Sequence, residues 1–145
     1  MTFYNRMKLE FINKSENESF ARVAVAAFVS QIDPTIEELI EIKTALSEAV
    51  TNSIIHAYDK NEEGIIELNC TINDYTVEMI IEDHGVGIED INQAREPLFT
   101  SKPEQERSGM GFTVMETFVD EMDVQSLPGE GTKVTLKKTL NRDIQ

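Results

Sequence analysis

The strongest constraint on the fold is a pair of neighbouring segments in which apolar and polar residues alternate. Residues 64–72, GIIELNCTI, show this pattern, and residues 77–81 repeat it after the turn-forming pair Asn73-Asp74. A period of two is typical of a strand with one buried face, so the two segments predict an antiparallel hairpin. The side chains expected on its buried face are Ile66, Leu68, Cys70, Ile72, Val77, Met79 and Ile81.

The chain before this hairpin predicts one strand and two helices. Residues 3–12 alternate with Met7, Leu9 and Phe11 on one side, as in a half-buried strand. The first helix follows Ser15 and Glu18, which have the spacing of a capping box. Its apolar residues at helical spacing are Phe20, Val23, Ala24, Ala27 and Phe28. The second helix should run from about Pro34 to Tyr58, with Asp33 as its cap.

The chain after the hairpin predicts a short helical stretch near residues 91–95 and a polar segment, 97–108, without a core face. A third helix should follow SGMGF, and a last hairpin, 124–127 with 132–139, turns through PGEG. The residues expected to face inward on the third helix are Phe112, Met115, Phe118, Val119 and Met122. This order does not repeat βαβ units. It favours an α+β, two-layer sandwich: a mostly antiparallel sheet with helices packed on one face, in a single domain spanning 1–145.

Charge and composition exclude several classes of function. Thirteen Lys and Arg stand against 27 Asp and Glu, a net charge of −14, so direct binding to nucleic acid is not expected. The longest apolar run, residues 23–29, is too short to cross a membrane, and the N-terminus lacks a signal-peptide pattern, so a cytoplasmic location is expected. Cys70 is the single cysteine, which rules out an internal disulfide.

A polar stripe marks the second helix. Glu48, Asn52 and His56 recur every fourth residue and therefore share one side of the helix, while most of the surrounding residues are apolar. A solvated face is the plainer interpretation of this stripe. A carboxylate beside a carboxamide also suits a site that holds a hard cation and activates a hydroxyl.

Two glycine motifs follow at other places in the chain. EDHGVGI places Asp83, Gly85 and Gly87 directly after a predicted strand, where the glycines permit close approach and a fixed carboxylate can accept from an amino group. RSGMGF places glycines at the start of the third helix, where free N–H groups and an arginine favour an anion. Each motif alone is also explained by an ordinary turn or helix entry.

The order of the three motifs resembles the GHKL family of ATP-binding domains, shared by gyrase, Hsp90, MutL and histidine kinases. Glu-x-x-x-Asn lies on a helix, Asp-x-Gly-x-Gly follows a strand, and Gly-x-Gly precedes a helix. The likeness extends from the first helix to GEGTKVTL and implies the GHKL, or Bergerat, fold with ATP or ADP and Mg²⁺ as ligands. Ala57 stands where that family often has glycine, and His84 stands where an acidic residue is frequent.

The resemblance implies roles for individual residues around the base and the metal. Asn52 would coordinate Mg²⁺, and Glu48 would be the general base toward a substrate hydroxyl. Asp83 would contact the adenine amino group beside Thr132. Gly85 and Gly87 would shape that part of the site.

The resemblance also implies a phosphate-binding segment. Its residues would be Ser108, Gly109, Met110 and Gly111 through their backbone, with Arg107 on the γ-phosphate and Lys102 assisting. Arg107 would thus act in catalysis as well as in binding. Residues 97–108 would then form a lid over ATP, which accounts for the missing core face.

SENESFARV, SEAVTNSIIHAY and PLFTSKPEQERSGMGF are similar to the anti-sigma factor kinases of sporulation within this family. The likeness implies two partners, a sigma factor and an anti-anti-sigma factor that is phosphorylated on serine, and a homodimer. Glu18 and Arg22 are the residues expected to contact a partner. Two alternatives are a related stress-response switch kinase and a binding module that holds ATP without transferring phosphate.

Overall fold

The structure, a computed structural model, describes residues 2–59, 61–96 and 111–142. Within them, five strands form one antiparallel sheet of order β1-β2-β3-β5-β4. The strands are β1 (Tyr4–Ile12), β2 (Ile65–Asn73), β3 (Thr76–Asp83), β4 (Glu121–Leu127) and β5 (Gly131–Thr139). The helices are α1 (Glu16–Val29), α2 (Ile36–His56), α3 (Ile91–Ala94) and α4 (Gly111–Phe118), with a 3-10 turn η1 (Ser30–Ile32) between the first two.

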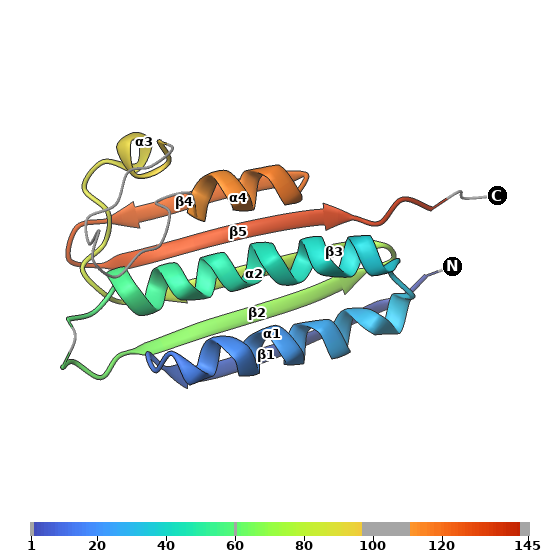
Figure 1. The fold of residues 1–145 in the computed structure, drawn as a ribbon, viewed down its shortest axis with the longest axis horizontal. Coiled ribbons are helices and arrows are strands. Elements are labelled where there is room, and N and C mark those ends of the chain that lie inside the picture. Colours follow the sequence, from blue (N-terminus) through green and yellow to red (C-terminus); the bar gives the residue numbers. More distant parts are fainter. Residues whose placement is uncertain (1, 60, 97–110, 143–145) are drawn as a thin grey trace.

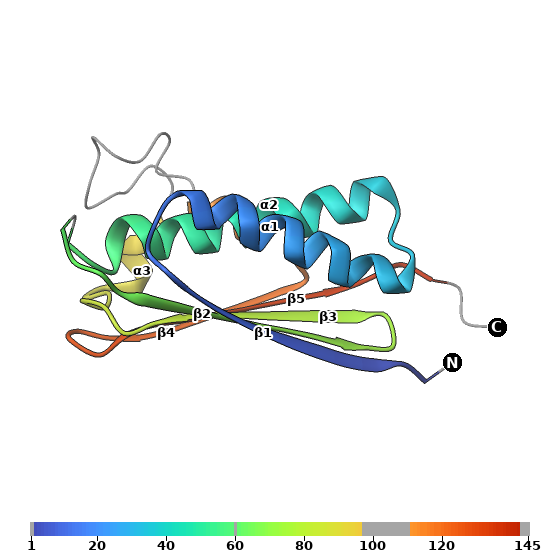
Figure 2. The same ribbon diagram turned by 90° about the horizontal axis from the view of Figure 1, so that it is seen from below.

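The helices and the sheet form two layers (Figures 1 and 2). In Figure 2, α1 and α2 lie over one face of the sheet, and α2 packs between α1 and α4. The predicted two-layer α+β architecture with a mostly antiparallel sheet is therefore confirmed. The core lies between the layers, where the inward residues of β2, β3 and β5 meet the buried sides of the helices.

The predicted central hairpin is confirmed in its register. β2 pairs with β3 so that Cys70 lies opposite Met79, and Asp74 adopts a left-handed conformation (φ 54°) in the turn. β3 also pairs with β5, where Met79 lies opposite Leu136. All the side chains predicted for the buried face of the hairpin are 0–1% exposed. This hairpin therefore forms the middle of the sheet.

The first helix is present with Ser15 at its N-cap, but the predicted capping box is absent and the predicted apolar residues do not form the fully buried side. Ser15 has a helical backbone and makes no side-chain capping bond to the helix. The buried residues are Ala21, Val25 and Val29, while Phe20 and Val23 are 57% and 64% exposed. The helix is apolar around most of its circumference, so hydrophobic spacing alone did not determine which side meets the sheet.

The second helix begins at a different cap from the one predicted. Thr35 is the N-cap of α2: its hydroxyl accepts a hydrogen bond from the Glu38 N–H (3.0 Å), and the Glu38 carboxylate accepts one from the Thr35 N–H (2.9 Å). Asp33 instead ends η1 in a left-handed conformation (φ 51°). The prediction failed because Thr35 and Glu38 form a reciprocal capping box, which satisfies two backbone N–H groups where Asp33 would satisfy one.

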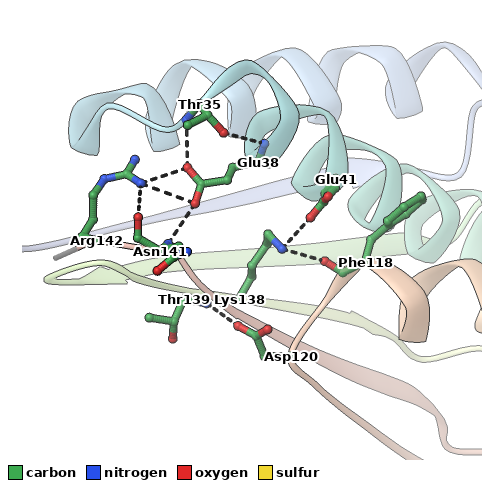
Figure 3. A network of polar contacts seen from close by, with 9 residues as sticks. All are labelled: Thr35, Glu38, Glu41, Phe118, Asp120, Lys138, Thr139, Asn141 and Arg142. Atoms are coloured by element: carbon green, nitrogen blue, oxygen red, sulfur yellow. Dashed lines mark hydrogen bonds and ion pairs between the residues drawn. The ribbon is translucent and has the colours of Figure 1, made fainter.

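Residues 138–142 pack against the start of α2 (Figure 3). Glu38 accepts a hydrogen bond from the Asn141 N–H (2.9 Å) and forms an ion pair with Arg142 (3.1 Å). Lys138 of β5 forms an ion pair with Glu41 of α2 (2.6 Å). These five residues, two on α2 and three in or just after β5, are called the C-terminal clamp.

The third long helix is shorter than predicted. α4 ends at Phe118, and Met122, expected on its inner face, lies in β4 opposite Leu136. Phe112 and Met115 are buried as predicted. Val119 lies between the end of α4 and the start of β4, and it packs against the core. The sequence pattern predicted Met122 on the helix because apolar residues continue at spacings of three and four beyond the end of α4.

Candidate functional site

The predicted polar stripe lies along the C-terminal half of α2. Glu48, Asn52 and His56 are half-buried, whereas Ala49 and Ser53 on the adjoining side are buried. Because residues four apart share a side of a helix, the three polar side chains line one side while others pack on the sheet and on α4. The stripe is thus neither a fully solvated face nor part of the core.

Asp83 ends β3 on the face of the sheet that the helices cover and is 3% exposed. Its Oδ1 accepts hydrogen bonds from the N–H groups of Gly85 (3.1 Å) and Thr132 (3.2 Å), and its Oδ2 accepts one from Ser53 Oγ (3.0 Å). Burial raises the pKa of the Asp83 carboxyl, and the hydrogen bonds offset this only in part. Since a carboxylate oxygen accepts two hydrogen bonds, Oδ2 keeps one acceptor position for a ligand.

Two glycines let the segment after β3 approach its neighbours closely. A Cβ on Gly85 would lie 2.0 Å from the carbonyl oxygen of Ala57, which accepts a hydrogen bond from the Val86 N–H (2.8 Å). Gly87 has a φ of 77°, and a Cβ there would lie 2.2 Å from the carbonyl oxygen of Leu127. Both positions therefore require glycine, and the loop is held between the end of α2 and the end of β4.

Thr132 lies directly opposite Asp83 in the pairing of β5 with β3. Its Oγ1 is 2.8 Å from Ser126 Oγ, which donates to the carbonyl oxygen of Gly131 (2.8 Å) and accepts from the Ile88 N–H (2.7 Å). A serine has one hydroxyl proton, so Thr132 is the donor toward Ser126. The lone pairs of Thr132 Oγ1 therefore remain as acceptors beside the Asp83 carboxylate.

Tyr58 connects the end of α2 to both strands of the central hairpin. Its hydroxyl donates to the carbonyl oxygen of Ile65 (2.7 Å) and accepts from the His84 N–H (2.9 Å). Its ring leaves no room for a side chain on Gly64, where a Cβ would lie 2.3 Å from a ring carbon. Burial raises the pKa of the Tyr58 hydroxyl, which keeps it protonated as a donor. Tyr58 thus fixes the backbone that follows Asp83.

Most of the predicted phosphate-binding segment lies outside the residues that the structure describes. Lys102, Arg107, Ser108, Gly109 and Met110 all lie outside the described residues. Gly111 is the first residue of α4, which packs against α2. An ion pair joins Arg95, at the end of α3, to Glu116 of α4. The structure thus brings the start of α4 to the helix that carries the polar stripe.

The two predicted partner residues lie on α1 and pair with each other. Arg22 is 3.5 Å from the Glu18 carboxylate, which also accepts a hydrogen bond from Ser47 Oγ of α2 (2.9 Å). Glu18 therefore connects the two helices. Both side chains are half-buried, which leaves part of each open to a partner.

Sequence reasoning missed several residues that build the site. Ser53, Tyr58, Ser126 and Gly131 all contact the Asp83 region or support it. Ser53 offered one available signal, a hydroxyl on the apolar side of a helix one position after Asn52. Ser126 and Tyr58 act through tertiary contacts, which no local pattern reveals.

The arrangement places an acceptor set for an amino group next to a carboxylate and a carboxamide. Asp83 and Thr132 supply acceptor oxygens at the end of the sheet, and Ser53 joins them to the helix that carries Glu48 and Asn52. Carboxamide oxygens are ligands that Mg²⁺ takes in proteins. The residue types fit an adenine nucleotide and its metal ion.

None of the described helices is both long and apolar enough to span a bilayer.

Comparisons with known proteins point to the same kind of site. The sequence profile of the histidine kinase-like ATPase domain family matches residues 13–138. A protein named anti-sigma F factor from Clostridium novyi (strain NT) is 60% identical over 136 residues, covering 94% of this chain and 95% of the relative. One from Clostridium kluyveri (strain NBRC 12016) is 61% identical over 137 residues, covering 94% and 96%.

Two solved structures share the fold. A crystal structure of the RsbU and RsbW domains of a Mycobacterium tuberculosis protein matches with a TM-score of 0.69 at 18% identity, over 97% of this chain and 34% of that one. The histidine kinase domain of a blue-light activated histidine kinase from Erythrobacter litoralis EL346 matches with a TM-score of 0.55 at 20% identity, over 85% and 61%. At these identities the likeness supports the fold alone.

Proposed function

This chain belongs to the histidine kinase-like ATPase domain family, with anti-sigma F factors among its relatives, and on that premise we propose that it is an anti-sigma factor and an ATP-dependent protein serine kinase. It holds a sporulation sigma factor away from RNA polymerase and phosphorylates a serine of an anti-anti-sigma factor. The observation that carries the proposal is 60% identity to a protein named anti-sigma F factor over 94% of the chain.

The adenine is bound at the end of β3. The free acceptor position on Asp83 Oδ2 takes a hydrogen bond from the exocyclic amino group, and Thr132 lies beside the same ring. Gly85 and Gly87 keep the following loop close to α2 and β4, so the edge of the ring meets backbone. The support for this assignment is that three protein donors already fix the carboxylate of Asp83 in one orientation.

The chemistry takes place along the α2 stripe. Asn52 supplies a carboxamide oxygen to Mg²⁺, which neutralises phosphate charge when it is bound. Glu48 accepts the proton of the substrate serine as the serine oxygen bonds to the γ-phosphorus. The bond from that phosphorus to the β,γ-bridging oxygen breaks, and ADP leaves. The two residues are one helical turn apart, which suits a base and a metal ligand acting on one phosphate.

The remaining phosphate contacts belong to the segment that leads into α4. Backbone N–H groups there hold phosphate oxygens, and two cations neutralise the γ-phosphate. The residues assigned to this role are Lys102, Arg107, Ser108, Gly109, Met110 and Gly111. Arg107 stabilises the transferred group and is therefore catalytic as well as binding.

A homodimer is the expected assembly. β1 is an edge strand of the sheet, and an edge strand can pair with another chain. Multi-angle light scattering on the purified protein should give twice the mass of one chain, 16.4 kDa. A monomer at working concentration would remove this part of the proposal.

The decisive experiment mixes the protein with Mg-ATP labelled on the γ-phosphate and a candidate anti-anti-sigma protein, and locates phosphoserine by mass spectrometry. Glu48→Gln should abolish transfer while calorimetry still shows nucleotide binding. Glu37→Gln, on an exposed position of the same helix, is the matched control and should leave transfer unchanged.

The outcomes separate the alternatives. Nucleotide binding without label on any substrate would favour a binding module that needs ATP only for its shape. Label on a stress-response antagonist, and none on a sporulation one, would place the chain in the other switch pathway. Unchanged transfer by Glu48→Gln would remove the assignment of the base.

A further inference from the structure

One imidazole and two carboxylates meet on the face of the sheet away from the helices. Glu67 of β2, Glu82 of β3 and His84, just after β3, place one ligand atom each within 4.8 Å of the other two. Alternation along the strand sends Glu82 and His84 to this outer face, while Asp83 between them points to the helices. We propose that these three residues bind one divalent transition-metal ion, for which Zn²⁺ is the best fit.

The register of the sheet sets two carboxylates side by side at this place, although Lys133 of β5 lies directly opposite Glu82 on its other side. Glu67 lies directly opposite Glu82, and on its other side directly opposite Glu10 of β1. Like charges in directly opposed positions destabilise an antiparallel pair. Lys8 lies 3.5 Å from Glu10 and 3.8 Å from Glu67, so it can remain paired with Glu10 when a metal ion takes Glu67. A cation between Glu67 and Glu82 would remove the repulsion between them.

The ligand set selects the kind of ion. Imidazole nitrogen suits Zn²⁺ and similar ions, whereas Ca²⁺ and Mg²⁺ take oxygen ligands and more of them. Three protein ligands leave a fourth position for water. Bonds of about 2 Å in a tetrahedral site bring the ligand atoms to about 3.3 Å from one another, so small side-chain rotations suffice.

The backbone at this place is already ordered. Glu67 and Glu82 are held by the pairing of β2 with β3, and the His84 N–H donates to the Tyr58 hydroxyl (2.9 Å). The Glu67 side chain is 21% exposed and His84 is exposed, so an ion can reach the cluster from solvent. Preorganised ligands on neighbouring strands lose little conformational freedom when the metal binds.

The proposed ion is distinct from the Mg²⁺ that accompanies the nucleotide, because it lies on the opposite face of the sheet. It also does not depend on the proposed kinase function. The test therefore uses Zn²⁺ alone, without nucleotide, on the full chain free of any histidine tag. Calorimetry should show one ion bound per chain, and excess Mg²⁺ should not displace it.

Variants locate the ion. His84→Ala and Glu82→Gln should each weaken Zn²⁺ binding at least about tenfold, since loss of even an outer-shell partner costs that much. Glu78→Gln is the matched control: Glu78 lies on the same face of β3 but pairs with Lys137 at 3.5 Å, and the variant should keep full affinity. Zn²⁺ should raise the Tm of the wild type and leave that of His84→Ala unchanged.

Three results would overturn the proposal. One is the absence of binding heat with the wild type. Another is unchanged Zn²⁺ affinity in His84→Ala, or a loss in His56→Ala instead, since the chain has two histidines. The third is displacement of Zn²⁺ by Mg²⁺, which would mean a general acidic surface. A normal melting curve for each variant without metal confirms that lost binding is not lost folding.

Discussion

Ser53 Oγ donates a hydrogen bond of 3.0 Å to Asp83 Oδ2, and both side chains are buried, 6% and 3% exposed. This bond joins α2, one residue after Asn52, to the end of β3. It connects the part of the site assigned to the metal ion and base with the part assigned to the adenine. The carboxylate is consequently fixed before a nucleotide arrives.

Replacing Ser53 with Ala should weaken nucleotide binding without abolishing it. The buried Asp83 carboxylate loses one of its three donors, at a cost of about 1 kcal/mol or near fivefold in Kd. Ser47→Ala is the matched control, because Ser47 is on the same helix and its hydroxyl bonds to Glu18 instead. Calorimetric titration with ATP measures both variants. Equal Kd values for wild type and Ser53→Ala would show that the bond does not position Asp83.

Replacing Gly85 with Ala should abolish nucleotide binding. The new Cβ would lie 2.0 Å from the Ala57 carbonyl oxygen, and because that atom is backbone, the loop after Asp83 must move. Gly129→Ala is the control, since nothing lies within 4 Å of a Cβ there although φ is 81°. That variant should lose about 1 kcal/mol of stability and keep its affinity. Full ATP affinity in Gly85→Ala would contradict the packing argument.

The C-terminal clamp should weaken in acid. Burial raises the pKa of Glu38, but hydrogen bonds from the Thr35 and Asn141 N–H groups and the charge of Arg142 outweigh burial, and the pKa is lowered. A carboxyl with a lowered folded-state pKa contributes stability above its unfolded pKa and loses it as the pH falls through the folded pKa. Glu38→Gln should therefore be less stable than the wild type near neutral pH.

The size of the stability loss in Glu38→Gln and the pH range in which it appears make the test specific. We expect a loss of about 1 kcal/mol in the free energy of unfolding at about pH 7, and a smaller loss as the pH falls through the lowered pKa of Glu38, where the wild type gives up its charge at this position. Urea unfolding followed by circular dichroism measures it. Glu37 is an exposed neighbour of Glu38, and Glu37→Gln should show no such pH-dependent loss of stability. A deficit of equal size throughout this pH range would indicate a packing effect instead.

The sequence was sufficient to predict the sheet but not every packing interface. The hairpin of β2 and β3 follows from alternation and the Asn73-Asp74 turn, both of which are local signals. The predicted N-cap of α2 was wrong because Asp33 and Thr35 are both favourable cap residues. The choice between them depends on the reciprocal hydrogen bonds of Thr35 with Glu38. Contacts such as Ser53 with Asp83 join residues 30 positions apart and leave no pattern in either segment.

The buried side of α1 was predicted wrongly for a different reason. Apolar residues occur on several sides of this helix, so spacing suggested that Phe20 and Val23 face the core, yet Ala21, Val25 and Val29 do. Phe20 and Val23 are left exposed to solvent. A departure from the expected pattern is often found where a protein binds something else.

The exposed apolar residues of α1 should therefore contribute to binding the sigma factor. Phe20 and Val23 lie on the same helix as Glu18 and Arg22, the predicted partner residues. Phe20→Ser should weaken sigma-factor binding by about 1–2 kcal/mol, roughly tenfold in Kd, because that apolar area no longer leaves water on binding. Its free energy of unfolding should change by only about 0.5 kcal/mol, as for other surface substitutions.

A matched variant separates this surface from general hydrophobicity. Ile36→Ser removes an apolar side chain that is 81% exposed at the start of α2, and it should leave sigma-factor affinity unchanged. Surface plasmon resonance with the sigma factor immobilised compares the two variants, and transfer of phosphate to the anti-anti-sigma factor checks that each still folds. If Phe20→Ser and Val23→Ser both bind like the wild type, α1 does not form the partner surface, and the exposed residues need another explanation.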